Sequence, residues 1–160
     1  LDVTRPRSFS SCRFKNDICF DLVDVVSYNI YPKWYHNTPV AMYLDDLYKW
    51  VQTTGGAGKP FLITEVGAGA IYGYRTPAKV KWSEEYQVLA LEEQLGAILS
   101  YKDCSGVYIW QFCDVRVTND WWNTRPRTMN NKGIVDEYRR PKLSYETVKR
   151  IFGSVDTYRK

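Results

Sequence analysis

Histidine and paired cysteine are scarce in this sequence, which limits the chemistry it can support. The 160 residues include one histidine, His36, and the four cysteines form no Cys-x-x-Cys pair and no metal-ligand spacing with it. A histidine–cysteine metal site is therefore not expected. Cys104 and Cys113 flank an apolar segment and Cys19 lies among apolar residues, so we interpret these and Cys12 as buried free thiols rather than disulfides.

Long apolar runs and basic runs are also absent. No stretch has the pattern of a signal peptide or a membrane span, so no membrane partner is expected and a cytoplasmic location is predicted. The net charge of +4 comes largely from scattered arginine and lysine, so a nucleic-acid partner is not expected either. The chain begins with Leu-Asp-Val-Thr instead of methionine, which suggests a piece of a longer protein.

Aromatic residues, in contrast, are abundant, with 13 Tyr and 6 Trp. Aromatic pockets suit sugars, because the C–H faces of a sugar stack on rings while its hydroxyl groups need polar partners. The same residues also fill protein cores, so this composition only favours a carbohydrate ligand. The length is enough for one domain with a substantial core.

The hydrophobic pattern predicts an alternation of strands and helices. We expect strands at 7–14, 23–31, 61–65 and 106–112, a helical turn at 16–22, and helices at 39–54, 84–102 and 142–152. Two long irregular loops, 67–81 and 114–131, lie between them, and long ordered loops are usually functional. Such alternation indicates parallel strands with crossover helices, either in a doubly wound sheet or in part of a closed barrel.

The two longer helices show caps and apolar stripes. Thr38 is expected to cap the first helix and Ser83 the second. Near-helical spacing predicts one buried stripe in each helix. These stripes comprise Met42, Leu44, Leu47, Tyr48 and Val51 in the first helix, and Val88, Leu91, Leu95, Ile98 and Leu99 in the second.

One carboxylate stands at a position where chemistry is common. Pro60 precedes the short apolar run 61–63, Glu65 follows at the carboxyl end of that expected strand, and Gly67 allows the backbone to turn away. Barrels of alternating strands and helices place their active sites at this end of the strands. The alternative is a glutamate that caps the next turn or pairs with a lysine.

Several motifs, in a fixed order, cover nearly the whole chain. They are Leu1-Asp2-Val3-Thr4-Arg5-Pro6, Asn29-Ile30-Tyr31 with Trp34-Tyr35, Ile63-Thr64-Glu65-Val66-Gly67, Trp82-Ser83-Glu84-Glu85-Tyr86-Gln87, Asn130-Asn131-Lys132-Gly133 and Arg140-Pro141-Lys142. With these motifs the chain resembles the catalytic domain of glycoside hydrolase family 2, and is most similar to the β-glucuronidases of that family. The resemblance implies a partial (β/α)8 TIM barrel, with residues 1–153 as its C-terminal half (strands five to eight) and 154–160 as a tail.

The resemblance also implies a mechanism. Glu65 would be the nucleophile of a retaining, double-displacement hydrolysis of β-D-glucuronides, which needs no metal or organic cofactor. The family's acid/base glutamate lies in an Asn-Glu-Pro motif that this sequence lacks. Other acids, such as Glu84, Glu92 and Glu93, fall on predicted helices and are interpreted as solvated or capping residues. We therefore expect a fragment that is inactive alone, with the rest of the barrel, the N-terminal β domains and a homo-oligomeric assembly as its partners.

By the same resemblance, Tyr31 and Tyr35 would lie near the sugar, and Trp110 would form the floor of the pocket. Asn130 and Lys132 match the Asn-x-Lys motif that binds the sugar carboxylate. Core aromatic residues and a surface turn are the structural alternatives for these positions. A family arginine falls at Pro126 here, so neither Arg125 nor Arg127 can be assigned to the substrate. Val66 stands where an aromatic residue is common.

Other activities remain open at this point. A β-galacturonidase would use the same carboxylate clamp, and a β-galactosidase or β-mannosidase would stay within the family. A non-catalytic half-barrel that serves only as a binding or folding unit is the alternative from another class.

Overall fold

The computed structural model describes residues 4–155. By backbone contacts the chain divides into two compact units. The first comprises Leu1–Val66 and Ala97–Tyr108, and the second comprises Gly67–Gly96 and Ile109–Lys160. The expected tail begins after the last helix, but its residues 156–160, like residues 1–3 of the first motif, lie outside the described part.

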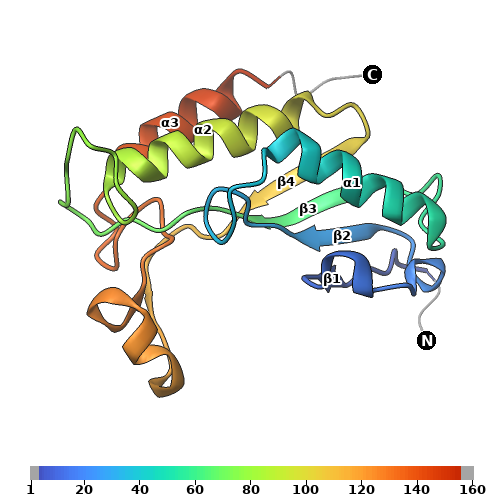
Figure 1. Cartoon of the computed structure of the whole chain (residues 1–160), viewed down its shortest axis with the longest axis horizontal. Coiled ribbons are helices and arrows are strands. Elements are labelled where there is room, and N and C mark those ends of the chain that lie inside the picture. The colour runs from blue at the N-terminus through green and yellow to red at the C-terminus, as the bar shows by residue number, and fades with distance from the viewer. Residues whose placement is uncertain (1–3, 156–160) are drawn as a thin grey trace. The chain divides into compact units, whose positions relative to one another are not determined.

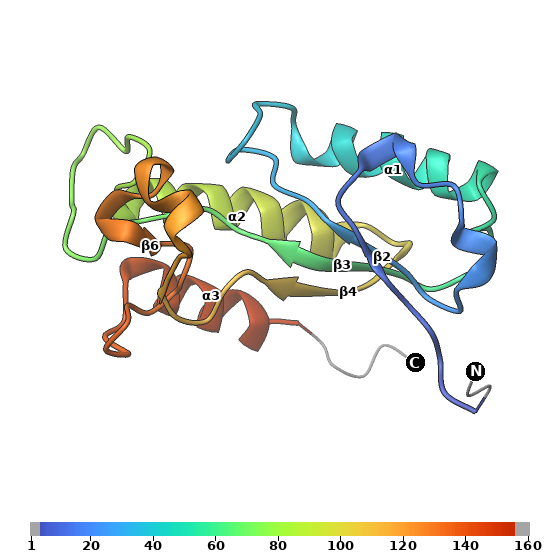
Figure 2. The same ribbon diagram turned by 90° about the horizontal axis from the view of Figure 1, so that it is seen from below.

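A four-stranded sheet is the centre of the first unit, in the order β1 (Ser10–Ser11), β2 (Val26–Asn29), β3 (Phe61–Val66) and β4 (Cys104–Ile109). β1 and β3 both pair with β2 in parallel. Figures 1 and 2 show β2, β3 and β4 side by side and pointing the same way. The predicted parallel alternation is thus confirmed, as a sheet that is open over the residues described.

The strands predicted at 7–14 and 23–31 are shorter in the structure, at Ser10–Ser11 and Val26–Asn29, and the strand predicted at 106–112 spans Cys104–Ile109. In the region 7–14 only Ser10–Ser11 joins the sheet. Ahead of it the contacts are irregular, since the carbonyl of Arg7 accepts hydrogen bonds from both Asp24 N at 2.9 Å and Val25 N at 3.1 Å. Ser8 Oγ donates to the carbonyl of Val25 at 2.8 Å, and the Arg7 side chain pairs with Asp24 at 3.0 Å. The predicted turn at 16–22 consists of two short 3-10 helices, Phe14–Asn16 and Phe20–Leu22.

Helix α1 (Val40–Thr53) covers the sheet of the first unit (Figure 1). Its buried face consists of Val40, Leu44, Leu47 and Val51, at the spacing of one helical stripe. Met42 was wrongly predicted in that stripe: it is 63% exposed, because two residues from Val40 is more than half a turn around the helix. The predicted cap is also wrong, since Pro39 occupies the N-cap and no side chain caps the helix.

The second unit contains most of α2 (Glu84–Ser100) and all of α3 (Leu143–Gly153). Ser83 Oγ accepts a hydrogen bond from Tyr86 N at 3.2 Å, which confirms the predicted cap of α2. Within the predicted stripe, Leu91, Leu95 and Ile98 are buried while the other two members are half-buried. Three polar residues of α2, Glu84, Gln87 and Gln94, are fully buried as well.

The loop predicted as irregular at 114–131 contains regular structure. β5 (Val115–Arg116) and β6 (Met129–Asn130) pair in antiparallel fashion. The 3-10 helices η3 (Asn119–Thr124) and η4 (Pro126–Thr128) lie between them in sequence.

The cysteines are free, as predicted, but their predicted burial is wrong. Cys12 and Cys19 are exposed, and Cys104 and Cys113 are half-buried. Within residues 4–155, no group of three or more metal-ligating side chains is placed to hold a metal ion. None of the helices described is both long and apolar enough to span a membrane.

Candidate active site

A tyrosine and a carboxylate meet at the carboxyl end of two neighbouring parallel strands. Glu65 lies near the end of β3, and Tyr31 follows β2. The strands hold this register because Ile30 N donates to the carbonyl of Glu65 at 2.8 Å, after a bulge at Tyr28/Asn29. Tyr31 Oη donates to Glu65 Oε2 at 2.6 Å. The pairing therefore follows from strand topology, although the two residues are far apart in sequence.

The protonation of Tyr31 is fixed by its surroundings. Burial raises the pKa of its hydroxyl far above the ordinary value, and the hydrogen bond to Glu65 and the charge of Glu65 raise it further. The hydroxyl accordingly stays protonated and serves as a donor to the carboxylate. Short donor contacts of this kind orient an ionised carboxylate.

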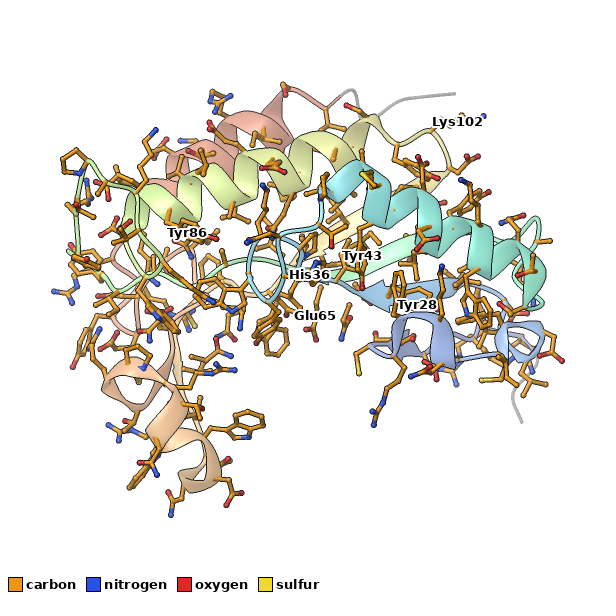
Figure 3. The ribbon with its side chains drawn as sticks, in the orientation of Figure 1. Tyr28, His36, Tyr43, Glu65, Tyr86 and Lys102 are labelled. Atoms are coloured by element: carbon orange, nitrogen blue, oxygen red, sulfur yellow. The ribbon has the colours of Figure 1, made fainter. Side chains whose placement is uncertain are left out.

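Glu65 opens into a pocket of about 310 Å³. The residues that line it are Cys12, Asn29, Tyr31, Tyr35, His36, Tyr43 and Glu65. Tyr35 is 57% exposed and sets its ring edge-on to Tyr31, with 5.4 Å between ring centroids. His36 stacks on Tyr43 at 4.8 Å, and Figure 3 shows both near Glu65. Aromatic walls around one carboxylate provide the mixture of stacking and polar contact that a sugar needs.

Two neighbours of this pocket have structural contacts. Asn29 Oδ1 accepts a hydrogen bond from Thr64 Oγ1 at 2.8 Å and so ties β2 to β3. Val66, at the position where an aromatic residue is common, is fully buried. It therefore belongs to the core of the first unit and not to the wall of the pocket.

The remaining predicted site residues, Trp110, Asn130 and Lys132, lie in the second unit. Trp110 is 38% exposed, and its carbonyl approaches Gly67 so closely that a Cβ there would stand 2.3 Å from the oxygen. Lys132 is only 4% exposed. Its backbone N–H donates to Asn130 Oδ1 at 3.3 Å, so the motif Asn-x-Lys forms a closed local turn.

Beneath this turn lies an ion pair to which the sequence analysis assigned no role. Lys142 Nζ and Asp114 Oδ1 are 2.8 Å apart and both side chains are fully buried. Burial raises the pKa of Asp114 to about 6, against the lowering effect of Lys142 and of the hydrogen bond from Gly133 N. One signal of this pair was present in the sequence: a lysine at the start of a predicted helix opposes the helix dipole, and so calls for a specific partner.

Two other predictions concern charged residues. Arg127 pairs with Glu137 at 2.5 Å, and the Arg125 guanidinium lies 5.5 Å from the Trp121 ring. Glu84 was interpreted as solvated or capping, and the solvated alternative is wrong. It is fully buried, and its carboxylate accepts hydrogen bonds from the N–H of Leu143, the first residue of α3, at 2.6 Å and from Gly73 N at 2.7 Å.

Comparison with known proteins gives a consistent result. The family model described as "Glycosyl hydrolases family 2, TIM barrel domain" matches residues 1–157. The β-glucuronidase of Rattus norvegicus is 34% identical over 156 residues, which cover 90% of this chain and 22% of the relative.

Two solved structures extend this comparison. A GH2 β-galacturonidase from Eisenbergiella tayi, solved with galacturonate, is 72% identical with a TM-score of 0.92 over 94% of this chain and 27% of that one. A Lactobacillus rhamnosus β-glucuronidase is 30% identical with a TM-score of 0.77, over 92% and 26% of the two chains. The present chain thus spans about a quarter of the length of the relatives it matches.

Proposed function

Because this chain belongs to glycoside hydrolase family 2, as part of its TIM barrel domain, we propose that the full-length protein is a retaining β-uronidase. The observation that carries the proposal is the contact of 2.6 Å between Tyr31 Oη and Glu65 Oε2 in an aromatic-lined pocket at the carboxyl ends of parallel strands. It supplies an oriented carboxylate at the place where barrel enzymes carry out their chemistry.

In the proposed mechanism, Glu65 attacks the anomeric carbon of the bound sugar. A covalent glycosyl-enzyme forms with inversion, and a water molecule then displaces Glu65 with a second inversion, so configuration is retained. A second carboxyl group, about 5–5.5 Å from the first in retaining enzymes, protonates the leaving oxygen and then activates the water. We propose that a part of the full-length protein outside these 160 residues supplies it, and that the 160 residues alone do not turn over substrate.

The sugar is proposed to be a uronate, held through its carboxylate by Lys132 and Asn130. A lysine ammonium pairs with a carboxylate, and an amide can donate beside it. A neutral sugar would leave the buried ammonium without that anion, which penalises galactosides and glucosides. The turn that joins the two residues, and the 4% exposure of Lys132, support a preorganised anion site.

Between the two uronates, we propose β-D-galacturonides as the preferred substrates. The 72% identity to a β-galacturonidase far exceeds the 34% identity to a β-glucuronidase, and favours the first activity. β-D-Glucuronides are the second candidate, because the curated relatives are β-glucuronidases. The two sugars share the carboxylate and differ in configuration at C4, so the carboxylate clamp alone does not discriminate between them.

The nucleophile is tested by covalent trapping in the full-length protein. A 2-fluoro β-galacturonosyl fluoride should inactivate the enzyme: Glu65 displaces the anomeric fluoride, and the peptide that contains Glu65 gains the mass of the 2-fluorogalacturonosyl group. Glu65→Gln is expected to abolish both turnover and labelling. A label on any other residue would overturn the assignment.

The substrate class is tested by comparing aryl galacturonide, glucuronide and galactoside as substrates. Lys132→Ala should weaken transition-state binding of the uronides by about 2–5 kcal/mol, as for a close charge pair, and affect the galactoside much less. Lys149→Ala, on the exposed face of α3, is the matched control and should change neither. Equal losses on uronide and galactoside would refute the uronate clamp.

A further inference from the structure

The backbone of the Asn131–Gly133 turn is held at each of its three carbonyl groups. The carbonyl of Asn131 accepts from Ala70 N at 2.8 Å and from Lys142 Nζ at 3.1 Å. That of Lys132 accepts from Gln111 N at 3.1 Å. That of Gly133 accepts from Gln87 Nε2 at 3.0 Å. Such complete hydrogen bonding fixes the direction in which Lys132 leaves the backbone.

Lys142 is the centre of this arrangement. Its ammonium donates to the carbonyl of Ala70 at 2.6 Å, to Asp114 Oδ1 at 2.8 Å and to the carbonyl of Asn131 at 3.1 Å. These three acceptors match the three protons of an ammonium group. Asp114 Oδ1 also accepts from Gly133 N at 2.8 Å, so the pair holds the turn on both sides of Lys132.

Gln87 of α2 makes a second bridge between the same two segments. Its amide nitrogen donates to the carbonyl of Ala68 at 2.8 Å as well as to that of Gly133, and its oxygen accepts from Ser144 Oγ at 2.7 Å. Lys142 and Gln87 therefore join 68–70, the segment that follows Glu65 in the chain, to the turn that carries Lys132. Gly133 itself has no room for a side chain, since a Cβ would stand 2.4 Å from Asp114 N.

A buried ion pair contributes little net stability to a fold. Desolvation of the two charges offsets much of their attraction, and apolar replacements of such pairs are often neutral or stabilising. What the hydrogen bonds of such a pair do provide is a fixed conformation of the groups that they bind. Here those groups are the backbone atoms on either side of Lys132.

We propose that Lys142 and Asp114 are positioning residues for uronate recognition, which hold the Asn130–Lys132 turn in the geometry that receives the sugar carboxylate. This inference rests on the proposed function, in which Lys132 binds that carboxylate. The pair acts through Lys132 and through the turn, and it has no role in bond cleavage. Its removal should therefore act on uronide binding and leave the chemical step of a neutral substrate intact.

The first test is Asp114→Asn in the full-length enzyme. An amide oxygen can still accept from Gly133 N, while the charge opposite Lys142 is lost. We expect KM for the aryl galacturonide to rise about 10- to 150-fold, the range set by hydrogen bonds to charged groups. kcat for the aryl galactoside should stay within about threefold.

The matched control is Asp136→Asn. Asp136 is also a fully buried aspartate paired with a cation, but its side chain accepts hydrogen bonds from the backbone of Tyr138 and from the backbone and side chain of Arg140. This variant should retain the ratio of uronide to galactoside activity. If Asp114→Asn does not fold, the double variant Asp114→Asn, Lys142→Met replaces it, because it leaves no unpaired buried charge.

A double-mutant cycle separates positioning from a general structural role. On the Lys132→Ala background, Asp114→Asn should cause no further loss of uronide selectivity, because the pair acts through Lys132. If Asp114→Asn lowers uronide selectivity further on the Lys132→Ala background, or lowers uronide and galactoside activity equally, the inference is overturned. The proposed function still stands in that case, provided that Lys132→Ala alone lowers uronide activity selectively. An unselective Lys132→Ala would overturn both.

Discussion

Replacement of Tyr31 by phenylalanine removes one atom from the centre of the proposed site. The lost hydroxyl donates to Glu65 Oε2 at 2.6 Å, while the ring that contacts Tyr35 at a centroid distance of 5.4 Å remains. Shape and apolar packing are thus kept, and the carboxylate loses the donor that fixes its orientation. The expected defect lies in attack on the sugar and not in binding of the sugar.

The size of the defect follows from the kind of hydrogen bond. A hydrogen bond to a charged group contributes about 1.5–3 kcal/mol. If this whole contribution is lost from the transition state, kcat/KM falls roughly 10- to 150-fold. Steady-state kinetics of the full-length enzyme on an aryl galacturonide would measure the fall. The rate of inactivation by the fluoro-sugar should decrease by a similar factor, since it reports the first displacement.

Tyr28→Phe provides the matched control for this experiment. Tyr28 is 1% exposed and its hydroxyl donates to the carbonyl of Phe14 at 2.9 Å, so the variant loses a buried hydroxyl contact outside the Glu65 pocket. It should lower the melting temperature without lowering kcat. If Tyr31→Phe kept kcat/KM within threefold of the parent enzyme, the proposed function of the Tyr31–Glu65 pair would be refuted.

Two further predictions concern stability. Burial alone would raise the pKa of Asp136, but hydrogen bonds from the Arg140 side chain and from backbone N–H groups outweigh it and hold this pKa below its ordinary value. The ionised carboxylate of Asp136 therefore contributes its full stability at pH values above the unfolded-state pKa, which is about 3.9, and this contribution is lost as the pH falls through the lower folded-state pKa. The decrease in melting temperature caused by Asp136→Asn should accordingly be smaller at pH 3 than at pH 7. An equal decrease at both pH values would contradict this. Gly67→Ala would place a Cβ 2.3 Å from the carbonyl oxygen of Trp110 and should destabilise by about 1–3 kcal/mol in urea unfolding. Gly96→Ala, whose Cβ meets nothing within 4 Å in α2, should instead be neutral or stabilising, and a Gly67→Ala variant as stable as Gly96→Ala would disprove the close approach.

Local signals in the sequence were sufficient for much of the fold. The apolar run after Pro60 predicted strand β3, near whose end Glu65 lies, and Ser83 predicted the start of α2, because both signals depend on residues close together in the chain. The order of strands and helices left a doubly wound sheet and a barrel open. The match to the TIM barrel domain of the family decides for the barrel.

The errors arose where the partner of a residue is distant in sequence. The expected strand at 7–14 is reduced to Ser10–Ser11, and the residues before it contact Asp24 and Val25 through backbone and side-chain groups alike, which no local pattern reveals. Glu84 was interpreted from its place on a helix surface, yet it is buried by contact with Leu143, at the start of another helix. Propensity describes the segment, whereas tertiary contacts decide which polar groups are enclosed.

The residues of the candidate site also differ in whether sequence could identify them. Glu65 could be singled out from its place at the end of an expected strand, and Tyr31 from the family motif alone; the two meet because strand ends in a parallel sheet converge. Lys142 could be named only as part of a motif, because its acceptors include the backbone carbonyl of Ala70, and backbone atoms carry no sequence signature. Turnover of the uronate, on the present proposal, depends on both classes of residue. Homologues that keep Lys132 but lack the Lys142–Asp114 pair should accordingly recognise uronates less well, whatever their sequence at the clamp itself.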